Sequence, residues 1–225
     1  MKKNLFVLTL FSISMAMLES AVVIYLRALY YPEGFKFPVE TLGSTILVTE
    51  LFRELATLIM LATIGYMNGT NKTERIGAFF FSFGVWDIFY YVFLKIFLNW
   101  PASILDWDLL FLLPIPWIGP VLAPCIISLT LIGIYLLILY KKQQGIEVKL
   151  HRTFWLLAAL GFTVMLYTFM ADSTKVLIEV SQANNNFDLL RDIRSLIPKQ
   201  FNWPFFLLGE AVLLGAVSTL LKKSE

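Results

Sequence analysis

The chain has 225 residues, of which 58% are hydrophobic and only 15% are charged, and its formal net charge is +2. A soluble domain of this size carries about 25% charged residues, so the composition excludes an ordinary soluble protein. The basic residues are not clustered on one surface, so the small positive charge does not indicate a nucleic-acid-binding protein.

Apolar blocks of about 20 residues predict an all-α, polytopic transmembrane helix bundle, because that length crosses about 30 Å of hydrocarbon. The whole chain, 1–225, is expected to form a single integral membrane domain. About six spans are expected, over residues 5–30, 42–67, 76–99, 119–140, 153–171 and 203–221.

The first two predicted helices carry charge inside their apolar runs. Glu19 lies near the middle of the first, and Arg27 near its far end, from which a long side chain can reach the membrane surface. In the second, Glu50, Arg53 and Glu54 fall within one arc of roughly 100°. A charge in hydrocarbon costs roughly 2.5–3.5 kcal/mol on insertion scales, so this face is expected to point at other helices.

The third and sixth predicted helices add further acids. Asp87 lies near the centre of the third helix, with Tyr91 and Lys95 one and two turns later on the same broad face. Lys95 is close enough to the helix end to reach the surface, whereas Asp87 is not. The sixth helix contains Glu210.

Two connections are unusual. Residues 99–118 combine Trp, Asp and Pro with an apolar run that is too short to span, which predicts an amphipathic or re-entrant segment on the outer face, with a surface helix favoured. Residues 172–200 are polar with patchy helical periodicity, which predicts two short amphipathic surface helices.

The distribution of basic residues predicts the orientation. With six spans, the basic clusters fall on one side, which places both termini in the cytoplasm and the protein in the cell inner membrane. Trp117 is then expected at the outer interface. The residues counted on the inner side are Lys2, Lys3, Lys72, Arg75, Lys141, Lys142, Lys149, Arg152, Lys222 and Lys223.

A helical rise of 1.5 Å per residue places five acids in one slab between mid-membrane and the outer half. They are Glu19, Glu50, Glu54, Asp87 and Glu210. Arg53 is the only basic residue at the same depth, so some of these acids need a proton, a hydrogen bond or a cation.

The leading hypothesis is therefore transport or conduction of a proton or cation through these five acids and Arg53, supported by Arg27, Tyr91 and Lys95. One alternative is an intramembrane enzyme or metal-binding protein that acts on a lipid-like substrate. Its metal would be an oxygen-ligated divalent cation held by the same five acids, since the chain offers one Cys and one His. That single His makes haem an unfavourable cofactor.

A second alternative is a structural accessory subunit of a larger membrane complex. The sequence assigns no catalytic residue. The bilayer is the expected partner, and a homo-oligomer or a larger complex stays open as the assembled form.

Overall fold

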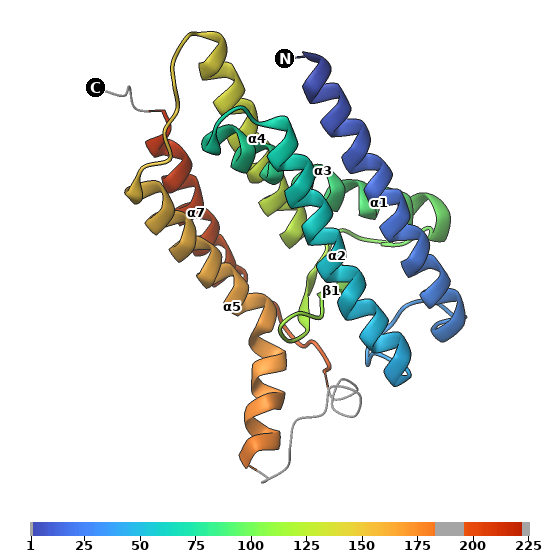
Figure 1. Cartoon of the computed structure of the whole chain (residues 1–225). Coiled ribbons are helices and arrows are strands. Elements are labelled where there is room, and N and C mark those ends of the chain that lie inside the picture. Colours follow the sequence, from blue (N-terminus) through green and yellow to red (C-terminus); the bar gives the residue numbers. More distant parts are fainter. Residues whose placement is uncertain (1, 183–195, 222–225) are drawn as a thin grey trace.

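The computed structural model of the chain describes residues 2–182 and 196–221, and it is predominantly helical (Figure 1). The helices in these ranges are α1 (Lys2–Tyr30), α2 (Ser44–Asn68), α3 (Lys72–Leu98), α4 (Leu122–Gln143), α5 (Arg152–Gln182) and α7 (Trp203–Thr219). Two short strands, β1 (Trp107–Phe111) and β2 (Trp117–Pro120), lie between α3 and α4.

Each of the six predicted spans overlaps one of these helices. Local signals fix several helix ends. Asn71 caps α3 by accepting a hydrogen bond from the Glu74 amide at 2.9 Å, and Asn202 caps α7 by accepting from the Phe205 amide at 3.2 Å. Asn99 ends α3 in the left-handed conformation, with φ of 50°.

Four helices, α1, α3, α4 and α5, are long and apolar enough to cross a membrane. Helix α2 has 25 residues, but Glu50, Arg53 and Glu54 reduce its hydropathy, and α7 is apolar but has only 17 residues. The structure therefore establishes a helical protein with four membrane-type helices, and it does not establish six spans.

The predicted end of the fifth helix at residue 171 is wrong, because α5 continues to Gln182. Residues 172–182 are mostly polar, which lowers hydropathy, but they contain neither Gly nor Pro and so have nothing to break a helix. One of the two predicted surface helices is thus part of α5, and residues 183–195 lie outside the described residues.

The surface helix favoured for residues 99–118 is also wrong. Strands β1 and β2 form an antiparallel hairpin in which Asp108 pairs with Gly119 and Leu109 with Ile118. Pro114 and Pro116 would interrupt a helix here, and the Trp-, Phe- and Ile-containing flanks suit strands.

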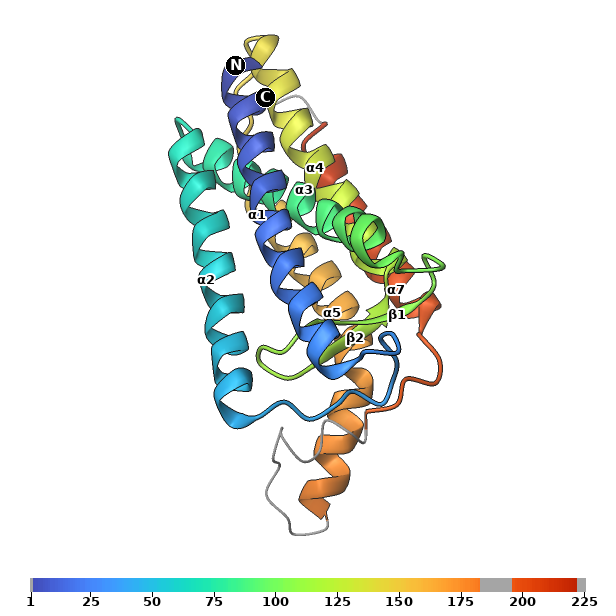
Figure 2. The ribbon, with the colours of Figure 1, turned by 90° about the vertical axis from the view of Figure 1, so that its right-hand side faces the viewer.

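The hairpin is buried inside the helical bundle. Asp108, Leu112 and Ile118 are 2%, 5% and 2% exposed. The hairpin lies beside the first half of α2, and strand β2 packs against α5 (Figure 2).

Helix α3 is central, because it packs against α1, α2 and α4, while α5 packs against α7 and strand β2. Helix α4 also touches α7 and connects the two groups. The beginning of α1 and the end of α7 lie at the same end of the molecule in both views (Figures 1 and 2).

Candidate functional site

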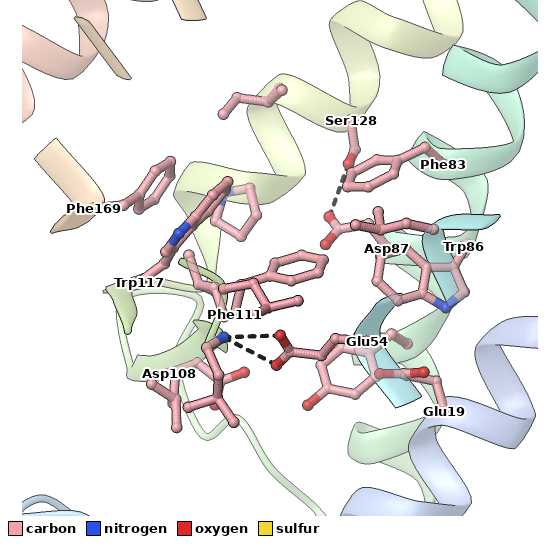
Figure 3. A pocket seen from close by; sticks show the side chains of 18 of the residues that line it. Glu19, Glu54, Phe83, Trp86, Asp87, Asp108, Phe111, Trp117, Ser128 and Phe169 are labelled. Carbon is pink, nitrogen blue, oxygen red and sulfur yellow. Dashed lines mark hydrogen bonds between the residues drawn. The ribbon is translucent and has the colours of Figure 1, made fainter. Parts of the chain in front are cut away.

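A cavity of about 630 Å³ is lined by residues of the hairpin and of each of the six helices in the described ranges. This volume falls within the range of roughly 300–1,000 Å³ typical of small-molecule sites. Figure 3 shows Glu54 and Asp87 on one side of the cavity, with Trp117 and Phe169 across from them. Its ionisable acidic and basic lining residues are Glu19, Arg27, Glu50, Arg53, Glu54, Asp87 and Asp108.

Arg53 joins two acids on neighbouring helices. Its guanidinium contacts Glu50 on its own helix, with Nη2 and Oε2 2.7 Å apart, and it also pairs with Glu19 of α1. Thr57 donates a further hydrogen bond of 3.1 Å to Glu19. The Arg53 side chain is 20% exposed, so this three-residue network is largely shielded from solvent.

Glu54 is buried and has a different kind of partner. Both carboxylate oxygens lie 3.0 Å from the backbone nitrogen of Leu112, which follows strand β1 in the hairpin. Helix α2 and the hairpin are thereby joined through the Glu54 carboxylate and the Leu112 amide, which lies just outside strand β1. Within residues 2–182 and 196–221, no lysine or arginine forms an ion pair with Glu54.

Asp87 is buried between α3 and α4. One of its oxygens accepts a hydrogen bond of 2.8 Å from the Ser128 hydroxyl. Gly84, one turn earlier, permits this approach, because a Cβ at that position would lie 2.5 Å from the Ser128 carbonyl oxygen. No ion pair reaches Asp87 in the part of the chain that the structure describes.

Arg27 and Asp108 form a second buried ion pair, with Nη2 and Oδ1 3.1 Å apart. The Arg27 guanidinium also lies over the rings of Phe35 and Trp100, at 4.4 and 3.8 Å from the ring centroids. The ring of Tyr91 is 6.3 Å from that of Trp100 and completes this aromatic support. The sequence allows the long Arg27 side chain to reach the membrane surface, whereas in the structure it is 7% exposed and is held by its aromatic neighbours and Asp108.

Three side-chain contacts attach the hairpin to three helices. Asp108 binds Arg27 of α1, Leu112 donates to Glu54 of α2, and Ser173 of α5 donates a hydrogen bond of 2.6 Å to the Pro116 carbonyl. The hairpin thus forms part of the cavity wall and positions the backbone amide that meets Glu54.

The structure brings most of the predicted site residues together. Four of the five predicted acids, Glu19, Glu50, Glu54 and Asp87, line the cavity, as do Arg27, Arg53 and Tyr91. Glu210 does not line it. Its carboxylate accepts from Thr130 at the contact between α7 and α4.

Lys95 also lies apart from the cavity. Its ammonium donates to the Pro101 carbonyl at 2.9 Å and to the Asn99 carbonyl at 3.4 Å, so it stabilises the end of α3. The structure thus gives Lys95 a capping position and no place in the acid network.

Sequence reasoning missed Asp108, Ser128 and the hairpin amide. Asp108 belongs to the segment 99–118 that the sequence predicts on the outer face, although the apolar run Leu109–Leu113 follows it directly. Trp117, expected at the outer interface, lines the cavity, and its indole nitrogen is buried.

Within the described residues, no group of three or more His, Cys, Asp or Glu side chains is placed to hold a metal ion. The acids are instead distributed around the cavity, each with its own donor or ion-pair partner.

Comparison of the chain with models of protein families, with curated proteins and with solved structures gives no match. The function must therefore be argued from the cavity and its side chains.

Proposed function

We propose that the chain is a six-span protein of the cell inner membrane with both termini in the cytoplasm. The distribution of buried and exposed side chains on α2 supports counting this helix as a span. Glu50 and Glu54 are buried, whereas Phe52 and Ile59 are 67% and 56% exposed. The helix therefore directs its charge inward and apolar side chains outward, as a bilayer requires.

Labelling of single cysteines tests this topology. In a Cys125→Ala background, Gln144→Cys in the basic loop is expected to react with a membrane-impermeant maleimide only from the cytoplasmic side, and Glu33→Cys only from outside. Three proposed spans, α2, α3 and α4, lie between the two positions, so reaction of both from the same side would contradict this odd number. Reaction of Gln144→Cys from outside would reverse the orientation.

We propose further that the protein handles a proton or a cation at Glu54 and Asp87. The observation that carries this proposal is that both acids are buried at the cavity wall without an ion pair in the described chain. Arg53 is already engaged by Glu19 and Glu50.

An ionised carboxylate in such an environment is costly unless it is paired. The Leu112 amide and the Ser128 hydroxyl each supply a hydrogen bond, but neither carries a positive charge. A proton or a ligand cation would supply that charge, so exchange of either at these two residues is the chemistry that the site favours.

Flux measurements in proteoliposomes test the proposal. An imposed pH or cation gradient should drive flux through the wild-type protein, followed with a trapped pH dye or an ion-selective dye. Glu54→Gln is expected to reduce the rate by roughly tenfold or more, because the amide keeps the shape but cannot exchange a proton or bind a cation.

Glu33→Gln is the matched control, since the Glu33 side chain is 85% exposed in the loop after α1 and pairs only with Lys36 among the contacts described. Its flux should equal that of the wild type. A Glu54→Gln protein that inserts, stays monodisperse and transports at the wild-type rate would overturn the proposal.

An intramembrane enzyme acting on a lipid-like substrate is the second candidate. The apolar part of the cavity wall favours this candidate. Residues 2–182 and 196–221 contain no group of three His, Cys, Asp or Glu side chains placed to bind the metal ion that such an enzyme would use. The accessory-subunit alternative has no specific observation in its favour.

A further inference from the structure

The cavity is amphipathic along its length. At the hairpin end its wall contains Glu54, Asp87 and Asp108. Towards the N-terminal ends of α3 and α5, the wall is formed by Phe79, Phe80, Phe154 and other apolar side chains. A small inorganic ion needs only the first half, so the apolar half points to a ligand with a tail.

The polar half is complementary to a positive head group. Five acidic and two basic residues line the cavity. Both basic residues are already paired, Arg53 with Glu19 and Glu50, and Arg27 with Asp108. Glu54 and Asp87 are left to interact with a ligand, and an anionic head group would be repelled by them.

Aromatic rings add to this complementarity. Phe111 and Trp117 line the hairpin end, with ring centroids 5.4 Å apart. Aromatic faces attract ammonium groups, and they do so most strongly where water is excluded. Carboxylates beside aromatic rings are therefore a suitable environment for an organic cation.

The open side of the cavity lies along α5. Trp155, Ala159 and Phe162 line the cavity and are also exposed, Trp155 by 42% and Phe162 by 47%. Their spacing of four and three residues puts them in one stripe of the helix. Because this rim is apolar, it suits entry from hydrocarbon better than entry from water.

We propose that the ligand is a lipophilic amine, with its ammonium group between Glu54 and Asp87 and its apolar tail against the Phe79 and Phe80 end. It enters from the bilayer past the α5 stripe. This inference rests on the proposed function and names the chemical class of the cation that the two acids bind.

Three probes of equal chain length test the charge of the head group. Dodecylamine, dodecanol and dodecanoate are added to the full-length protein in lipid nanodiscs, and bound ligand is counted by native mass spectrometry with quenching of tryptophan fluorescence as a second readout. We expect saturable binding of one dodecylamine, with at least roughly tenfold weaker binding of the other two probes, since tenfold corresponds to about 1.4 kcal/mol.

A Glu54→Gln/Asp87→Asn variant should lose the preference for dodecylamine and leave all three probes equally weak. Equal binding of dodecylamine and dodecanol by the wild type would overturn the inference without any variant. Absence of saturable dodecylamine binding, with proton or inorganic-cation flux still sensitive to Glu54→Gln, would overturn the inference and leave the proposed function standing. Absence of both would overturn both.

Neighbouring positions on α5 test the route of entry. Ala159→Trp should slow the association of dodecylamine roughly tenfold or more, because the indole would occupy the rim. Leu160→Trp is the matched control, since Leu160 is exposed but does not line the cavity. Equal association rates for the two variants would show that the ligand does not pass this stripe.

Discussion

Replacement of Arg53 by methionine is expected to lower the free energy of unfolding by about 3–5 kcal/mol. Arg53 is the shared cation of Glu19 and Glu50, whose side chains are 11% and 7% exposed. Methionine fills a similar volume but leaves both carboxylates without a positive partner. The measurement is reversible unfolding in mixed micelles of dodecylmaltoside and SDS.

The rescue variant separates loss of charge balance from loss of packing. Adding Glu19→Gln and Glu50→Gln to Arg53→Met removes the unpaired charges, so most of the lost stability should return. Lys36→Met is the surface control, because the Lys36 and Glu33 side chains are 71% and 85% exposed, and it should change stability by less than about 1 kcal/mol. If the triple variant were as unstable as Arg53→Met alone, the network would act through packing.

The helices were predictable because apolar run length is a local property. The apolar runs that begin near Leu5, Leu42 and Ile76 are long enough to predict helices, and the structure forms helices there. The fifth helix shows the limit of that signal. Hydropathy falls at Asp172, whereas helicity ends only after Gln182, since a polar sequence without Gly or Pro continues a helix.

The hairpin was not predictable from periodicity. A strand with one buried face shows alternation, but Leu109 to Leu113 is uniformly apolar because the hairpin is enclosed by helices. The pairing that reveals its role, between the Leu112 amide and Glu54, joins residues 58 positions apart. No local pattern in the sequence contains that information.

That several acids would lie near one another was predictable, but their partners were not. Rise per residue placed Glu19, Glu54 and Asp87 at similar depth, and all three line the cavity. The same reasoning grouped Glu210 with them, although the Glu210 carboxylate accepts a hydrogen bond from Thr130 of α4 and does not line the cavity. Depth is one coordinate, whereas rotation about each helix axis depends on packing against its neighbours.

Loss of the Arg27–Asp108 pair is expected to have an effect as large as loss of Arg53, and it should also impair the site. Arg27→Met leaves Asp108, with a side chain 3% exposed, as a buried unpaired carboxylate, which corresponds to about 3–5 kcal/mol of stability. Unfolding in the same mixed micelles measures the loss. Adding Asp108→Asn should recover most of it, and the double-mutant cycle gives the coupling energy.

Lys95→Met tests whether any cation near this end of α3 matters equally. Lys95 is exposed and bonds only backbone carbonyls among the contacts described, so its removal should change stability by about 0.5 kcal/mol or less. A loss as large as that of Arg27→Met would contradict the assignment of Arg27 as the hairpin anchor.

The functional consequence distinguishes the two buried networks. Arg27 holds the strand that leads to Leu112, and the Leu112 amide meets Glu54, so Arg27→Met/Asp108→Asn should reduce flux and dodecylamine binding even where stability is recovered. The Arg53 triple variant keeps the hairpin anchors and should retain more of both activities. If the two rescued variants were equally active, the hairpin would serve only as part of the cavity wall, and Glu54 would not depend on it for its position.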